Sequence, residues 1–126
     1  SFNTNENIIS ISEGGNSCGF VNFNKEKFWS GGHNYTLQNL VIDTRFLYAL
    51  LKYIEKSIMS LRVGSGLPNI QKSSLLEFKI QIPTDLKEQE AIGEFFRKID
   101  GILEFSQKKI TKLENIKKYL LNKMFV

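Results

Sequence analysis

The 126-residue sequence predicts an α+β fold, in which a curved antiparallel sheet and one packed helix precede a long C-terminal coiled-coil helix. Three observations predict it. Short β-like segments separated by turn clusters fill residues 7–42, a helical apolar repeat follows up to residue 64, and a much longer helical repeat begins at residue 86. We therefore expect one compact domain over residues 1–85 and a long helix over residues 86–126.

The predicted sheet depends on three segments in the first third of the chain. Ile9 and Ile11 alternate with serines, as in a strand that buries one face. Residues 13–17 (Glu-Gly-Gly-Asn-Ser) are typical of a turn, and residues 19–23 form a second β-like piece. Residues 35–42 offer a third strand of mostly apolar and Thr character.

The packed helix is predicted between two conformational markers. Asp43 is a suitable N-cap, and Gly64 is a natural C-terminal stop. The spacing between them predicts one amphipathic helix of about four turns. Its apolar residues are Phe46, Leu47, Leu50, Leu51, Ile54 and Ile58.

A last strand is predicted after a loop. Residues 64–69 have the Gly, Ser, Pro and Asn content of a loop. Phe78, Ile80 and Ile82 then alternate with polar residues. This alternation predicts a half-buried strand that Pro83 closes.

The pattern from residue 86 onward is that of a single long helix. Asp85 can cap its first N–H groups, with Glu88 placed to complete a capping box. Gly101 costs roughly 1 kcal/mol relative to Ala, but the apolar phase continues past it, so we expect an unbroken rod on the order of 58 Å long. Such a rod needs a partner helix to cover its apolar stripe. This stripe, the seam, consists of Ile92, Phe96, Ile99, Leu103, Ile110, Leu113, Ile116, Leu120 and Met124.

The formal net charge of +4 is concentrated near the C-terminus. Residues 98–126 hold seven Lys or Arg against three Asp or Glu, which accounts for +4. The lysines concerned either solvate one face of the helix or approach phosphates in a sequence-independent way. They are Lys108, Lys109, Lys112, Lys117, Lys118 and Lys123.

The remaining composition is typical of a soluble globular protein. Cys18 is the only cysteine, which excludes an internal disulfide and cysteine-based zinc sites, and a cytoplasmic location is the default. No apolar run is long enough to span a bilayer. Ser1 begins the chain without an initiator methionine, which suggests a fragment or a trimmed protein.

His33 and Cys18 are the residues that could support catalysis or metal binding. A nucleophile and its base must be held together by a third group, and the sequence offers no such spacing. His33 can instead be a buried, hydrogen-bonded histidine at the start of a strand, or an exposed recognition residue. An enzyme built on this pair remains the rival hypothesis from a different class.

Three segments carry a resemblance to a known family. They are residues 19–37, the loop 64–70, and the stretch 80–90, which contains Ile-x-Ile-Pro followed by Leu-x-Glu-Gln. The last stretch is the most specific, because the long helical repeat comes directly after it. On these segments the chain resembles the specificity subunit of type I restriction-modification enzymes.

The resemblance implies a DNA-reading function. Residues 1–85 would be part of a target-recognition domain that lacks its opening strands, and residues 86–126 a spacer and dimerisation helix. Family members direct a separate methyltransferase subunit and a separate restriction subunit to a split site on double-stranded DNA. The chain is then expected to be no enzyme and to bind no cofactor. Its helix would pair with a second spacer helix, from a homodimer or from the second half of the specificity subunit.

Candidate DNA contacts lie in two polar loops and just beyond them. Gly64 and Gly66 let backbone amides approach a phosphate, and Asn69 can pair bidentately with adenine. Such a loop can also be only a turn, and the whole chain can be a structural dimerisation module without DNA binding. The candidate contacts are Gly31, Gly32, His33, Asn34, Tyr35, Arg62, Ser65, Gly66, Asn69, Lys72, Ser73 and Ser74.

Overall fold

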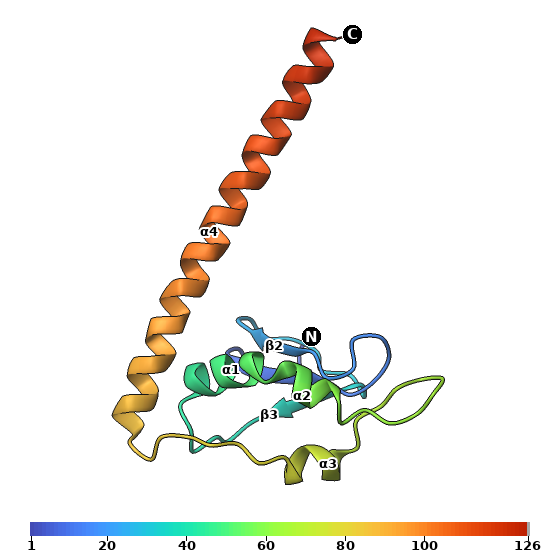
Figure 1. Cartoon of the computed structure of the whole chain (residues 1–126), viewed down its shortest axis with the longest axis vertical. Coiled ribbons are helices and arrows are strands. Elements are labelled where there is room, and N and C mark those ends of the chain that lie inside the picture. Colours follow the sequence, from blue (N-terminus) through green and yellow to red (C-terminus); the bar gives the residue numbers. More distant parts are fainter. Residues whose placement is uncertain (126) are drawn as a thin grey trace. The chain divides into compact units, whose positions relative to one another are not determined.

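The computed structural model describes residues 1–125, which form three strands and four helices (Figure 1). They divide into two compact units, Ser1–Glu94 and the helical part from Phe95 onward. The α+β class is confirmed, with an antiparallel sheet, packed helices and a long C-terminal helix. The predicted domain division after residue 85 stays a prediction.

The sheet has the strand order β2-β1-β3, with both pairings antiparallel. β1 (Ile8–Ser12) lies in the centre, β2 (Val21–Asn24) pairs along one edge and β3 (Asn34–Leu37) along the other. The third strand is shorter than predicted. It ends before Asn39, whose φ of 55° is a left-handed conformation that cannot continue a strand.

The single helix predicted between Asp43 and Gly64 is wrong, because the structure has two helices there. α1 (Thr44–Tyr53) and α2 (Glu55–Met59) are separated at Ile54, which has φ −97° and ψ 13°. The break lets the Glu55 carboxylate accept a hydrogen bond from the Val21 N–H at 2.8 Å, which attaches α2 to the start of β2.

Only the first end of this helical region depends on its predicted marker residue. The predicted Asp43 cap is confirmed, since its Oδ1 accepts from the Phe46 N–H at 2.8 Å. The helical region ends at Met59, five residues before Gly64. Gly64 instead takes a φ of 100° inside the following loop.

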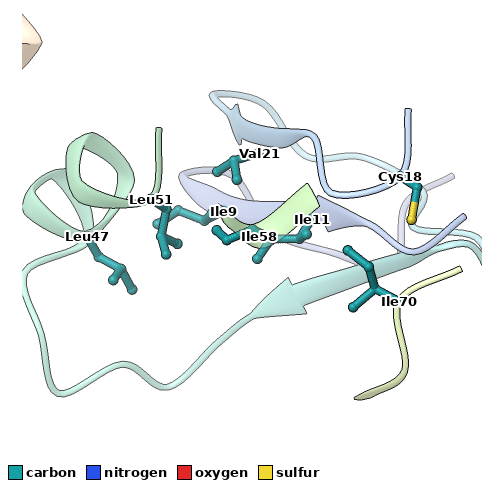
Figure 2. Packing of buried hydrophobic residues seen from close by; sticks show 8 residues of the cluster. All are labelled: Ile9, Ile11, Cys18, Val21, Leu47, Leu51, Ile58 and Ile70. Atoms are coloured by element: carbon teal, nitrogen blue, oxygen red, sulfur yellow. The ribbon is translucent and has the colours of Figure 1, made fainter. Parts of the chain in front are cut away.

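The core lies between β1 and the two helices α1 and α2. Ile9 and Ile11 point from β1 to one side of the sheet, where Leu47, Leu51 and Ile58 pack against them. Figure 2 shows these side chains in one row, with Ile70 and Cys18 beyond the Ile11 end. The core therefore reaches under the loops that follow β1 and precede α3.

The segment after the loop differs from the prediction in two ways. Lys72–Glu77 forms a short helix, α3, which the sequence did not predict. Residues 78–82 form no strand, so the last predicted strand is wrong. Their alternation nevertheless has a structural basis, because Phe78 and Ile80 pack against the core while Lys79 and Gln81 are exposed.

α4 (Leu86–Met124) is one continuous helix of 39 residues (Figure 1). At about 1.5 Å per residue its length is on the order of 58 Å, as predicted. Asp85 caps its start, since Oδ1 accepts from the Lys87 N–H at 2.9 Å. The reciprocal contact of Glu88 stays a prediction. Gly101 does not interrupt the helix.

Candidate functional site

Two of the loops predicted to bind DNA meet around one hollow in the first compact unit. His33 and Asn34 line it from the segment before and at the start of β3, and Asn69 lines it from the loop after α2. The turn that follows β1 forms the remaining wall. The full lining is Ser12, Gly14, Gly15, Ser17, His33, Asn34, Leu67, Pro68 and Asn69.

Main-chain hydrogen bonds hold the three walls together. The Glu13 N–H donates to the His33 carbonyl oxygen at 2.9 Å, and the Ile70 N–H donates to the Glu13 carbonyl oxygen at 2.8 Å. The Gly15 N–H donates to the Pro68 carbonyl oxygen at 3.0 Å. The backbone of Glu13 thus connects the three walls.

The loop from Val63 to Asn69 is closed by its own ends. The Val63 N–H donates to the Asn69 carbonyl oxygen at 2.8 Å, and the Asn69 N–H donates to the Val63 carbonyl oxygen at 3.0 Å. Gly64 permits the tight turn through its φ of 100°. The middle of the loop, Ser65 to Leu67, is exposed and available for contact.

Two titratable groups lie beneath the hollow. Burial raises the pKa of the Tyr35 phenol above its ordinary value of 10.0, and the charge of Glu13 raises it further. Its hydroxyl donates to the Ile70 carbonyl oxygen at 2.8 Å. Tyr35 therefore supports the loop after α2 from below.

Cys18 is buried, and its thiol donates to the Glu13 carbonyl oxygen at 3.2 Å. Burial raises the pKa of the Cys18 thiol above its ordinary value of 9.0, although the nearby Arg62 opposes this shift. A raised pKa disfavours the thiolate that a nucleophile or a metal ligand requires. Within residues 1–125, no group of three His, Cys, Asp or Glu side chains could hold a metal ion.

The other predicted contacts do not line the hollow. His33 is exposed, so its interpretation as a buried histidine is wrong. Gly31, Gly32, Arg62, Ser65 and Gly66 are exposed but do not line the hollow, and Lys72, Ser73 and Ser74 form the first turn of α3.

Sequence reasoning did not identify the turn after β1 as part of the site. Residues 13–17 were predicted as a turn, which is confirmed by the φ of 74° at Gly15. The signal that could have pointed to a functional role is the run of Gly, Asn and Ser directly after a buried strand, of which Asn16 and Ser17 are exposed. Only the antiparallel pairing of β1 with β3 brings this turn beside His33.

The start of α4 packs closely against the start of α1. Gln89 is only 3 % exposed, and its Oε1 accepts from the Asp43 N–H at 3.0 Å. Its Nε2 donates to the Pro83 carbonyl oxygen at 2.7 Å. One turn later, a Cβ atom on Gly93 would lie 2.6 Å from the Phe46 nitrogen, so no larger residue fits.

The seam of α4 is largely uncovered. Leu103, Ile110 and Leu113 are 62 %, 49 % and 57 % exposed, whereas Ile92 and Ile99 are half-buried. A strict seven-residue repeat that starts at Ile92 and at Phe96 meets polar residues at two places, Ser106 and Lys117. None of the helices in residues 1–125 combines the length and the apolar character that a membrane span requires.

Comparison with known proteins gives the family. The model of the type I restriction modification DNA specificity domain matches residues 1–115. The chain belongs to this family. A type I specificity subunit of Mycoplasma genitalium is 37 % identical over 106 residues, which are 82 % of this chain and 27 % of that protein. A type I specificity subunit of Mycoplasma pneumoniae is 32 % identical and matches 98 % of this chain and 34 % of its own length.

A solved structure agrees with this specificity domain over almost its whole length. The crystal structure of the type I restriction-modification S subunit from M. genitalium superposes with a TM-score of 0.81 at 32 % identity. It covers 99 % of this chain, but the chain covers only 34 % of that subunit. The specificity domain described here thus spans 27–34 % of the length of the mycoplasma subunits that it matches.

Proposed function

We propose that this specificity domain reads a DNA sequence through the hollow between the turn after β1, the start of β3 and the loop after α2. The observation that carries the proposal is the meeting of His33, Asn34 and Asn69 at one place. A duplex reader needs a few polar groups that reach base edges, and these three side chains offer both donors and acceptors.

Further contacts would hold the DNA backbone and fix the register of the protein. Phosphates accept hydrogen bonds from Lys, Ser and backbone N–H groups, which carry no sequence information. Arg62 is exposed at the base of the loop, and Lys72 and Ser73 are exposed at the start of α3. The exposed glycines Gly31, Gly32 and Gly66 would permit a close approach of the duplex.

The seam of α4 would pair with a second spacer helix. Its exposed apolar side chains would lose contact with water only against another helix, and burial of each Leu or Ile is worth roughly 1.5–3 kcal/mol. The second helix would come from another copy of this chain or from a second half of a longer specificity subunit. Two reading units would then stand a fixed distance apart and recognise a split site.

Chemistry on the DNA would be left to other subunits. The proposed partners are a methyltransferase (modification) subunit and a restriction subunit, with double-stranded DNA as the target. The domain itself would contribute recognition and require no cofactor. The buried thiol of Cys18 and its raised pKa support this division of labour, since they give His33 no nucleophile to activate.

A structural dimerisation module is the second candidate, and the exposed seam favours it equally. The two functions differ in one measurable property. A DNA reader binds duplex DNA with an affinity that falls steeply as salt increases, because bound cations are released from the phosphates. A module that acts only through its helix shows no such binding.

Duplex binding by substituted chains tests the proposal. Lys72→Ala should weaken binding to all sequences alike and reduce the salt slope by about one. Asn69→Ala should remove discrimination worth roughly 1–3 kcal/mol at one base pair. Lys56→Ala, which changes an exposed lysine of α2 that does not line the hollow, serves as the control. Unchanged binding in both the Lys72→Ala and the Asn69→Ala variants would contradict the proposal.

A second experiment addresses the partners. Pull-down with the methyltransferase subunit from the same cell, followed by mapping of the methylated motif, should recover a complex whose motif changes with Asn69. If the Asn69→Ala variant forms the complex but methylates the same motif, the subunits assemble as proposed and Asn69 does not determine the sequence that is read.

A further inference from the structure

The side chain of Glu13 has a different environment from its backbone. Its backbone joins the three walls of the hollow, as described above, whereas its carboxylate lies beside the amide of Asn69. The Asn69 Nδ2 donates to the Glu13 Oε1 across 3.5 Å, a long hydrogen bond between residues 56 positions apart. Both residues are half-buried.

A carboxylate beside an amide group determines which way the amide faces. The oxygen and the NH₂ group of an asparagine have nearly the same shape, so hydrogen bonding decides between the two orientations. An ionised carboxylate only accepts hydrogen bonds, so it attracts the NH₂ group and repels the amide oxygen. The Glu13 carboxylate therefore turns the Asn69 Oδ1 away from itself.

This orientation leaves a defined pair of groups on Asn69 for a ligand. One N–H is held by Glu13, while Oδ1 and the other N–H remain. Those two groups match the N6 amino group and the N7 atom of adenine in the major groove, which respectively donate and accept. The other three bases do not present this combination to an asparagine.

We propose that Glu13 is a positioning residue that fixes the Asn69 amide and thereby makes this part of the hollow select adenine. The inference rests on the proposed DNA-reading function and adds to it the identity of one base. Glu13 itself need not touch the DNA. The main-chain bonds that hold the walls do not involve its side chain. The carboxylate also interacts with the Tyr35 phenol, so the thermal midpoint must be measured beside selectivity.

The test compares the intact chain with Glu13→Ala and Glu13→Gln, by selection from duplexes randomised in sequence. The unsubstituted chain should enrich adenine at one position. Glu13→Ala should reduce that preference about tenfold, since the amide can then face either way, with little change in the affinity for the unselected pool or in the thermal midpoint. Glu13→Gln keeps the size of the side chain but can offer either its oxygen or its NH₂ group to Asn69, so it should also lose most of the preference.

The outcomes separate this inference from the proposed function. If Glu13→Ala had the same base preferences as the unsubstituted chain at every position, the inference would be overturned and the proposed DNA reading would stand. A Glu13→Ala chain that loses all binding together with its thermal midpoint would also overturn it, because Glu13 would then be structural. A complete lack of duplex binding by the unsubstituted chain would refute the proposed function itself.

Discussion

Gln89 hydrogen-bonds to Asp43, and this contact joins the first turn of α4 to the N-cap of α1. The Gln89 Oε1 accepts from the Asp43 N–H at 3.0 Å, and the same amide donates to the Pro83 carbonyl oxygen at 2.7 Å. The single side chain thus satisfies one donor and one acceptor of the main chain in a place with little access to water.

Replacing Gln89 with Leu should lower the free energy of unfolding by roughly 1–3 kcal/mol, because the two main-chain groups lose their partners. Urea unfolding followed by circular dichroism measures the change. Glu90→Gln is the matched control, since Glu90 is the exposed neighbour and its substitution should matter by less than about 0.5 kcal/mol. Equal stability of the two variants would show that the two hydrogen bonds of Gln89 contribute nothing to the free energy of unfolding.

Two glycines of α4 should respond to alanine in opposite ways. A Cβ on Gly93 would lie 2.6 Å from the Phe46 nitrogen and 2.7 Å from the Asp43 Oδ1. Gly93→Ala should therefore destabilise the chain by about 1–3 kcal/mol. A Cβ on Gly101 meets nothing within 4 Å, so Gly101→Ala should stabilise the helix by up to about 1 kcal/mol. Thermal unfolding of both variants checks the signs, and a stabilising Gly93→Ala would contradict the packing described here.

Leu113→Asp should shift the chain toward the monomer, because it places a charge in the seam. Sedimentation velocity at several protein concentrations measures the oligomer. Asn115→Asp adds the same charge two residues away, off the seam, and should leave the oligomer unchanged. If Leu113→Asp sediments like the unsubstituted chain, the seam is not the surface of association.

Stability should fall as the pH rises above about 9, and Cys18 should account for the first part of the fall. Burial raises the pKa of its thiol above 9.0 in the folded chain. The unfolded chain therefore loses this proton first and binds fewer protons in that window, so the free energy of unfolding decreases with pH until the folded thiol also ionises.

The buried thiol can be separated from the phenol by substitution. Cys18→Ala should flatten the decline that begins near pH 9, whereas Tyr35→Phe should act above the ordinary phenol value of 10.0. Urea midpoints recorded at intervals from pH 7 to about 10.5 measure both effects. A decline in Cys18→Ala that matches the unsubstituted chain would assign the effect to other groups.

Periodicity predicted the elements whose local pattern and tertiary environment agree. Ile9 and Ile11 formed the central strand, Asp43 capped a helix and α4 continued past Gly101. The break at Ile54 has no marker in the local pattern, and it accompanies a hydrogen bond between Glu55 and Val21 across 34 residues. Phe78 and Ile80 have the alternation of a strand, but packing on the core satisfies it without a neighbouring strand.

The candidate site shows the same limit. The sequence shows the glycine and asparagine content of its loops. It also shows the motif Leu-x-Glu-Gln, but no local pattern explains why its last residue is glutamine. The structure supplies that reason, since Gln89 is the residue that bonds to Asp43 and Pro83. The grouping of His33 with Asn69 follows from strand pairing and loop closure, which no local pattern encodes.

The joint made by Gln89 and Gly93 also bears on protein engineering. A chimera spliced at residue 85 would take Asp43 and Gln89 from different parents. It would also set Gly93 of one parent against a different residue set in place of Asp43 and Phe46, where space is tight. Grafts that carry the first turns of α4 along, with the splice placed after Glu94, keep donor and acceptor from one parent.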